Sequence, residues 1–463
     1  MSRENVRAVK DKTGKGRTVL FVIAINLLVF LGLLAAIEIG FRTVEKTHIS
    51  HLKNAGQALR FFWTMYRPFV MFVVTPLKHY EFANLYAPGA QSKKFDAEFK
   101  LNSDGFVIDH ELDFSKPYPK GKNERFVLFT GGSAAWGVGA TNNNTNVAGR
   151  MEYYLNRKQS TYKYRVLNFG NGGWMSFQEF VALAYWGRSY AADWVITMDG
   201  VNDGTLVCGE ANGAGRPMHN DSVEAYVMAY LFGQTKPVFF RGWLEDTLLR
   251  HSSLYRGITG QSPLRIPSNL DYLLGSTPEG RQGVMRDVKW IEVERQRHFY
   301  IDTQRQIANL FPSAKVILST QPMVNQFRGH FMNIYDHPRG SPERQKAIQE
   351  LEQALQTVYN VMHDKPCGNA LKGENFGYFF ASIALGSERV AQSMSTPQRP
   401  VIYENMGRFF EDDFESRKQY FVDPVHMSEK GMDVLGQKYA QIILSSDLAQ
   451  AEMGNPALSA SAH

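Results

Sequence analysis

From residue 125 onward, short apolar runs alternate with segments of helical periodicity. Four of the runs are bounded by turn residues, a pattern typical of buried strands. They are 125–130 (RFVLFT), 164–169 (YRVLNF), 194–198 (WVITM) and 315–320 (KVILST). Helical periodicity marks 146–158, 177–188, 288–310, 342–363 and 432–444. Strands that alternate with helices predict a mostly parallel sheet with helices on both faces, a three-layer α/β/α fold.

A strongly apolar segment precedes this region, from Val19 to Ile37, with Asn26 as its only polar side chain. At about 1.5 Å per residue it nearly spans a hydrocarbon core of about 30 Å. A core helix of a soluble domain would show a polar face, which this segment lacks. A cleaved signal peptide is the alternative, but Leu34 stands where its cleavage site needs a small residue. We therefore expect a retained transmembrane anchor.

The excess of basic residues is concentrated before this anchor. Lys and Arg outnumber Asp and Glu by 51 to 45, and the first seventeen residues hold six of the basic residues and two of the acidic ones. The remaining chain is nearly neutral and has no basic stripe for a nucleic acid. A basic tail before an apolar helix places the N-terminus in the cytoplasm and the following chain outside the membrane.

These patterns divide the chain into five parts. They are a cytoplasmic tail (1–17), a transmembrane anchor (18–41), a lead-in segment (42–115), a catalytic domain (116–445) and a flexible tail (446–463). Residues 205–285 and 325–415 are expected to be insertions in the domain. The aromatic stretch 61–76 within the lead-in is too short and broken to span a membrane, so it should pack on the domain or contact the membrane surface.

Candidate chemistry follows the strands, where ligands bind in a parallel sheet. Ser133 stands in a Gly-Gly-Ser turn after the first strand, and Gly173 ends a glycine-rich turn after the second. Asn202 follows the third strand, and Asp423 lies three residues before His426 near the C-terminus. Each motif alone is ordinarily a turn, a cap or a surface pair. Together they supply the nucleophile, oxyanion donors and base that acyl transfer needs.

The physical chemistry of these groups fits such a reaction. A serine hydroxyl is a weak nucleophile at neutral pH and needs an adjacent base. Imidazole changes charge near neutral pH, so His426 can take the proton of Ser133 and return it to the leaving group. Asp423 would orient the imidazole. We expect no cofactor and no metal, because the sequence has no HExxH, GxGxxG, Walker loop or clustered His/Cys site.

The segments GGSAAWG (131–137), NFGNGG (168–173), GVND (200–203) and DPVH (423–426) resemble the four conserved blocks of the SGNH/GDSL hydrolase superfamily. GGSAAWG is most similar to the block of its membrane-anchored bacterial branch. The resemblance implies a Ser133–His426–Asp423 triad and an oxyanion hole formed by Ser133, Gly173 and Asn202. The oxyanion glycine depends on register, and Gly172 is its alternative. Ala134 stands where this branch often has Thr.

This branch includes esterases and polysaccharide O-acetyltransferases, some acting beside a multispanning acyl-donor protein. The resemblance therefore implies acyl-ester hydrolysis or acyl transfer on an O-acetylated polysaccharide, in the periplasm and at the inner membrane of a bacterium. A general lipid or small-ester esterase and a non-catalytic scaffold are the alternatives. The aromatic residues of the insertions could stack on sugars or form small cores; they include Phe239, Phe240, Trp243, Tyr378 and Phe380.

The only two cysteines, Cys208 and Cys367, both lie in the exported part. They could form a disulfide in an oxidising compartment, or they could be two unrelated buried thiols. Their spacing alone does not decide between the two.

Overall fold

The structure is a computed structural model. It describes residues 21–44, 64–67, 71–74, 80–87, 93–108, 111, 118–157, 162–208, 252–258, 290–324, 332–362, 374–410 and 413–454. The chain divides into two compact units, each considered by itself. The first comprises Met1–Phe61 and Ala225–Leu270, and the second comprises Phe62–Glu224 and Asp271–His463.

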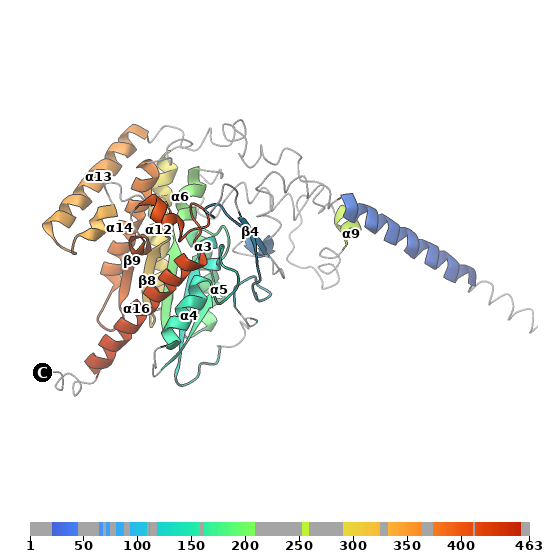
Figure 1. Ribbon diagram of the computed structural model, residues 1–463, viewed down its shortest axis with the longest axis horizontal. Helices are drawn as coiled ribbons and strands as arrows, with labels where there is room; N and C mark the ends of the chain where they lie inside the picture. The colour runs from blue at the N-terminus through green and yellow to red at the C-terminus, as the bar shows by residue number, and fades with distance from the viewer. Residues whose placement is uncertain are drawn as a thin grey trace, which may run out of the picture. The chain divides into compact units, whose positions relative to one another are not determined.

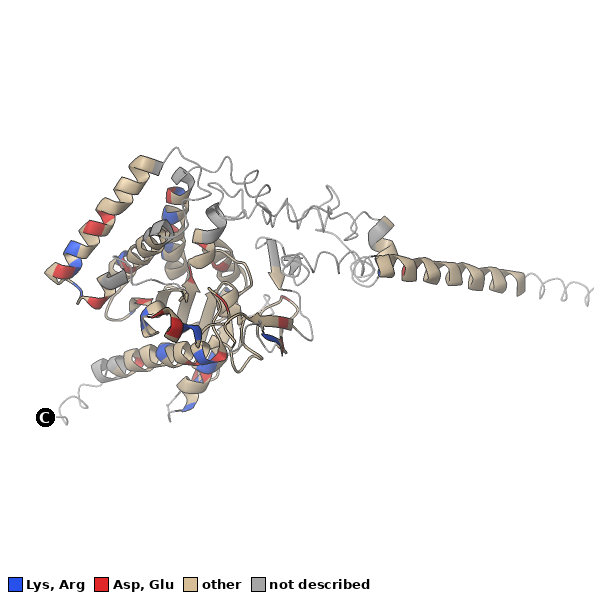
Figure 2. Ribbon diagram, turned by 45° about the horizontal axis from the view of Figure 1, so that its top comes forward, with Lys and Arg blue, Asp and Glu red and all other residues tan. Residues whose placement is uncertain are grey.

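The first unit contains the N-terminal apolar helix, Phe21–Val44, and the short helix α9, Ser253–Ile258. The N-terminal helix has a mean hydropathy of 2.6 over its most apolar window, none of which is buried. Figure 2 shows it as an almost unbroken tan ribbon, whereas α13 (Pro342–Met362) carries alternating red and blue residues. By length and composition this helix could cross a membrane.

The second unit is built on a five-stranded parallel sheet with the order β6-β5-β7-β8-β9. The strands are β5 (Glu124–Gly131), β6 (Lys163–Asn168), β7 (Trp194–Asp199), β8 (Lys315–Thr320) and β9 (Val401–Asn405). The central strands β5, β7 and β8 are buried along most of their length. Because both faces of a parallel sheet are covered by helices, the sequences of these strands are continuous apolar runs.

Successive side chains of a strand point to opposite faces, and each face has its own helices. Val127 and Phe129 of β5 pack with residues of α4 and α16 on one face. Phe126 and Leu128 pack with residues of α5 and α12 on the other, where α14 covers β8 and β9. The helices are α4 (Val147–Arg157), α16 (Glu429–Gly454), α5 (Ser176–Tyr185), α12 (Trp290–Leu310) and α14 (Glu374–Met394). Figure 1 shows α16, drawn in red, running across its face of the sheet. The three-layer α/β/α fold expected from the sequence is confirmed.

Shorter elements connect these layers. They are the α-helices α3 (Ser133–Trp136), α6 (Val201–Cys208) and α15 (Phe414–Lys418) and the 3-10 helices Gly187–Ser189, Met332–Asp336 and Met406–Phe409. The helix α13 packs on α14 through Ala347 and Leu351.

The lead-in segment contributes two antiparallel hairpins to the second unit. They pair β1 (Thr64–Arg67) with β2 (Met71–Val74), and β3 (Tyr80–Asn84) with β4 (Lys93–Ala97). Tyr80 is buried, and its ring lies 5.1 Å from that of Trp136 in α3. Val73 and Val74 are also buried, so this part of the aromatic stretch 61–76 packs on the domain.

Two expected boundaries differ from the structure. Residues 325–415 are not simply an insertion, because they supply α14 and the edge strand β9. Residues 401–405 (VIYEN) alternate between buried and half-buried positions, as an edge strand does, and so lack the continuous apolar run of the other strands. The closing helix α16 extends to Gly454, beyond the expected start of the tail at residue 446.

Candidate active site

The nucleophile candidate Ser133 is the first residue of α3 and is separated from the end of β5 by Gly132 alone. Gly131 and Gly132 join the two elements at positions where a side chain has no room. A Cβ at Gly131 would lie 2.3 Å from the carbonyl oxygen of Met198, and one at Gly132 would lie 2.6 Å from Nδ2 of Asn202. The two glycines therefore bring the turn close to strand β7 and to the Asn202 amide.

Ser133, His426 and Asp423 form a continuous hydrogen-bonded chain. Oγ of Ser133 lies 2.7 Å from Nε2 of His426, and Nδ1 of His426 lies 2.6 Å from Oδ2 of Asp423. His426 is buried, whereas Ser133 is half-buried. This is the arrangement of a hydroxyl nucleophile, a base and an acid that orients the base. The structure thus brings together the three residues that the sequence singled out as a triad.

The loop that carries Asp423 and His426 is fixed from both sides. Oδ1 of Asp423 accepts hydrogen bonds from the backbone N–H groups of Val425 (2.9 Å) and His426 (2.8 Å). Nε2 of Gln321 donates to the carbonyl oxygen of Val425 at 2.7 Å. Burial raises the pKa of Asp423, but the charge of His426 and the hydrogen bonds to the carboxylate outweigh it and hold this pKa below its ordinary value. Asp423 therefore stays ionised beside the imidazole.

Asn202 lies in the first turn of α6, with its amide against the glycine turn. Its Nδ2 donates to the carbonyl oxygen of Trp174 at 2.7 Å. An amide nitrogen carries two hydrogens, so this bond leaves a second one for a ligand. Gly173, the residue before Trp174, has a φ of 79°, a conformation that side chains rarely adopt. Gly172 has no such constraint.

Replacing Asn202 with Ala is expected to lower kcat by about 100- to 1000-fold, because one donor to the developing oxyanion is lost. KM should change little, since the donor acts mainly in the transition state. Steady-state kinetics on an acetyl ester measures both constants. Asn143 offers a matched control, because its amide also donates to a backbone carbonyl, that of Lys100 at 2.9 Å. Asn143→Ala should retain full activity. A loss in KM alone for Asn202→Ala would instead identify a substrate-binding group.

Three buried carboxyl groups lie directly behind this part of the site. Glu179 of α5, Asp199 at the end of β7 and Asp203 of α6 are all buried. Asp203 accepts hydrogen bonds from the backbone and hydroxyl of Ser176 and from Gln296. Through Asp203 the start of α5 is tied to the helix that carries Asn202, so the acid positions Asn202.

Burial also changes the protonation of these three carboxyl groups. Burial, together with the charge of Asp203, raises the pKa of Asp199 to about 7. Burial and the charges of Asp199 and Asp203 raise the pKa of Glu179 well above its ordinary value. The folded protein therefore keeps protons here that the unfolded chain releases above about pH 4 to 5.

We expect the free energy of unfolding to fall as the pH rises from about 5 through 7. The folded state then binds more protons than the unfolded state, at a cost of about 1.4 kcal/mol per pH unit for each proton retained. Glu179→Gln, which mimics the protonated acid, should flatten this dependence. Urea unfolding of the detergent-solubilised protein at several pH values measures the slope. Glu350→Gln, an exposed change on α13, should leave it unaltered. An unchanged slope in Glu179→Gln would contradict the assignment.

Several expected residues play other parts or fall outside the described residues. Phe380 is buried in the core cluster with Met175 and Val201, so it has no exposed ring for a sugar. Phe239, Phe240, Trp243, Cys367 and the side chains of Cys208 and Tyr378 lie outside the described residues. A disulfide between the cysteines stays a prediction.

The supporting residues of the site were not predicted from the sequence. Gln321, for example, follows strand β8 directly. The search of strand ends that identified Ser133 and Asn202 would have found it there. The role of Glu179 gave no such signal, because it lies within the amphipathic pattern of a helix.

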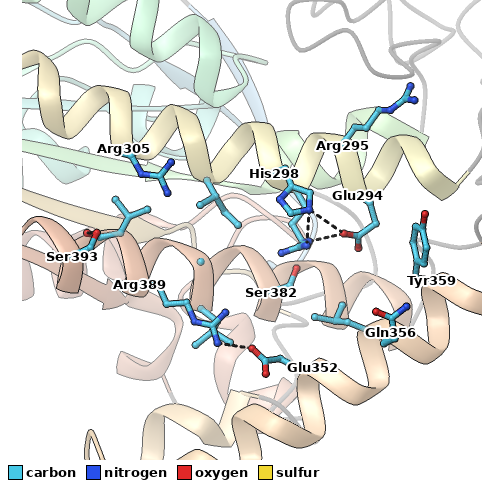
Figure 3. Close-up of a pocket in the computed structure, with 16 residues that line it drawn as sticks. Glu294, Arg295, His298, Arg305, Glu352, Gln356, Tyr359, Ser382, Arg389 and Ser393 are labelled. Atoms are coloured by element: carbon cyan, nitrogen blue, oxygen red, sulfur yellow. Dashed lines mark hydrogen bonds and ion pairs between the residues drawn. The ribbon is translucent and has the colours of Figure 1, made fainter.

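A groove of about 850 Å³ lies between α12, α13 and α14 (Figure 3). It contains none of the triad or oxyanion residues. Its arginines are largely paired with acids: Arg297 with Glu294 at 2.9 Å, and Arg389 with Glu352 at 2.5 Å. The groove is therefore separate from the candidate active site. In the described part of the chain, no group of three or more His, Cys, Asp or Glu residues could hold a metal ion.

Comparisons with known proteins give structural neighbours only. No family model matches the chain, and a search of curated proteins found no match. A protein described as a GDSL-like lipase from Parabacteroides merdae is 10% identical, with a TM-score of 0.35 over 70% of this chain and 97% of its own. For an acylhydrolase from Bacteroides fragilis the identity is 12% and the TM-score 0.29, over 72% and 92%. An acetylxylan esterase from Geobacillus stearothermophilus is 12% identical, with a TM-score of 0.31 over 70% and 95%.

The first of these is described as GDSL-like, a name of the superfamily that the motifs resemble. Likenesses at such identities and TM-scores say nothing about the activity of this chain. Its fold class rests on the parallel sheet and its two helical layers.

Proposed function

We propose that this chain is an SGNH-type serine esterase or O-acyltransferase, held at a membrane by its N-terminal helix. One observation carries the proposal: Ser133, His426 and Asp423 are linked by hydrogen bonds of 2.7 and 2.6 Å, next to an amide donor. The three residues come from two distant segments of the sequence. Such a chain has no evident structural purpose on a half-buried surface, whereas it is what acyl transfer through serine requires.

In the proposed reaction, Oγ of Ser133 attacks the carbonyl carbon of an acyl ester while Nε2 of His426 takes its proton. The negative charge that develops on the carbonyl oxygen is stabilised by the amide of Asn202 and by the N–H groups of Gly173 and Ser133. The C–O bond to the alcohol then breaks, and His426 protonates the departing alcohol. This leaves an acyl group on Ser133 and a free hydroxyl compound.

The second half of the reaction reverses these steps with a new acceptor. Water or a sugar hydroxyl gives its proton to His426 and attacks the acyl carbon, which releases Ser133. Water as the acceptor makes the protein an esterase, and a sugar makes it an acyltransferase. Because Asp423 is ionised, it stabilises the imidazolium formed in each half.

We further propose an O-acetylated polysaccharide as the substrate, met at the outer face of a bacterial inner membrane. The N-terminal helix supports this location, since its apolar length suits a single span and the basic tail before it suits the cytoplasm. A soluble enzyme would suffice for a small diffusing ester, whereas an anchored one suits a polymer made or exported at the membrane. A multispanning acyl-donor protein would be the partner of a transferase.

The test combines active-site labelling with a choice of acceptor. The detergent-solubilised chain should label with a fluorophosphonate and hydrolyse p-nitrophenyl acetate slowly. Acyl release should accelerate when an acetylated polysaccharide or an acceptor polysaccharide is supplied. Rapid turnover of small esters with no effect of any glycan would overturn the polysaccharide substrate and leave a general membrane esterase. Absence of labelling together with absence of turnover would overturn the proposal that the chain is an enzyme.

A further inference from the structure

Glu38, near the end of the N-terminal helix, binds a segment more than 200 residues away in the sequence. Its carboxylate accepts hydrogen bonds from the hydroxyl of Ser252 (2.7 Å) and from the backbone N–H groups of Ser253 and Leu254 (both 2.8 Å). Nε of Arg42, one turn further along the same helix, completes the set at 2.6 Å. All these residues belong to the first unit of the chain.

The position of Glu38 along the N-terminal helix indicates how deep this residue would lie in a membrane. It is the first charged residue after the apolar run, and it lies 17 positions after Phe21 at the start of the helix. At 1.5 Å per residue this corresponds to about 26 Å, close to the hydrocarbon thickness of about 30 Å. If the helix spans a membrane, Glu38 lies where the hydrocarbon ends, on the side of the exported chain.

A carboxylate at this boundary is costly unless it is hydrogen-bonded. Arg42 alone supplies one donor, and Ser252 together with the first turn of α9 supplies three more. Ser253, at the contact, is 1% exposed, so the contact is closely packed. The depth of Glu38 therefore also fixes the depth of α9.

The free surface of α9 suits the interface between lipid and water. Ile258, at its end, is 74% exposed, and Leu254 and Tyr255 are half-buried. Apolar and tyrosine side chains are favoured at this level of a membrane. In Figure 1, α9 lies beside the end of the N-terminal helix, drawn in blue.

We propose that α9 is a membrane-surface element, held by Glu38 at the outer lipid–water interface with Ile258 in contact with lipid. The proposal rests on the proposed membrane span of the N-terminal helix. It assigns a role to part of the insertion that follows α6: the chain leaves the membrane after Val44 and returns to it at α9. The protein is then bound to the membrane by two segments.

Fluorescence quenching in lipid vesicles tests this proposal on the full chain. Cys208 and Cys367 are replaced with Ala, and fluorophosphonate labelling must match that of the wild type. An environment-sensitive fluorophore is then attached after Ile258→Cys, Phe30→Cys or Leu448→Cys. Phe30 reports the span, and Leu448, 64% exposed on α16, is a matched apolar position outside the first unit. The vesicles contain phosphatidylcholine and phosphatidylglycerol with a nitroxide either near the headgroup or deep in the acyl chain.

We expect the label at position 258 to be quenched at least twofold more than that at position 448, most strongly by the shallow nitroxide. Glu38→Ala should reduce quenching at position 258 at least twofold and leave position 30 unchanged. Equal quenching at positions 258 and 448, with position 30 quenched by the deep nitroxide, would overturn the placement of α9 alone. No quenching at position 30 would overturn the membrane span as well. Quenching at position 258 that survives Glu38→Ala would overturn the part assigned to Glu38.

Discussion

Replacing Ser133 with Ala is expected to abolish covalent labelling by a fluorophosphonate and to lower kcat by about 10⁴- to 10⁶-fold. The hydroxyl is the only group lost, and its oxygen is the proposed nucleophile that His426 contacts at 2.7 Å. Ala is a good helix former, and the two residues that follow in α3 are already Ala134 and Ala135, so the turn should keep its shape. Gel fluorescence of the labelled protein and steady-state turnover of an acetyl ester measure the two effects.

Ser393→Ala provides the matched control, because Ser393 is an exposed serine in a helix of the same unit. This variant should label and turn over like the wild type. Stoichiometric labelling of Ser133→Ala would show that the nucleophile is another residue. An unchanged unfolding transition in Ser133→Ala would show that the loss is chemical and does not arise from misfolding.

Removing the imidazole of His426 should lower kcat about as much as removing the hydroxyl of Ser133 does. His426→Ala is expected to lower kcat by a similar factor, and the double variant with Ser133→Ala should be no slower than either single variant. The reason is that the two groups act as one unit: without the base, the hydroxyl keeps its proton. The kinetics of the three variants on one acetyl ester test this non-additivity. If the losses in kcat of the two single variants multiply in the double variant, the two residues do not share one role.

The acid of the triad offers a finer test of the same unit. In Asp423→Asn, the remaining oxygen can still accept the N–H groups of Val425 and His426, so the loop should hold. The new amide nitrogen would face Nδ1 of His426 and favour the wrong tautomer, a change that can cost up to about 10⁴ in kcat. Asp413→Asn is the control, since Asp413 is exposed and its capping bond to Ser416 can be made by Asn.

The sequence predicted those parts of the fold whose physical signal is local. Strands β5, β7 and β8 are buried on both faces, so their apolar runs were evident, and the bounds of β8 agree to the residue. The edge strand β9 lies at the end of the sheet, half-buried at alternate positions, and was taken for part of an insertion. The strands of the two lead-in hairpins have only four or five residues each, too few for a periodic pattern to identify them.

The same distinction applies to the candidate site. Ser133, Asn202, Asp423 and His426 each stand next to a recognisable turn or strand end, and the structure brings Ser133, Asp423 and His426 into one hydrogen-bonded chain. The contacts that support them are formed between elements far apart in the sequence. Asp203 binds Ser176 and Gln296, and Gln321 binds the loop of His426. Such partners become visible only when the helices are packed on the sheet.

The order of the triad along the chain bears on when activity can begin. Ser133 and His426 are 293 residues apart, and the base lies just before α16, the last helix described. If the chain is exported as proposed, the candidate nucleophile reaches the outer side of the membrane long before its base. Under the proposed mechanism, an emerging chain carries only an unactivated hydroxyl until residue 426 has been made. On the same basis, termination between the N-terminal helix and residue 426 yields an anchored protein without esterase activity, and no separate inhibitor is needed to keep the growing chain inactive.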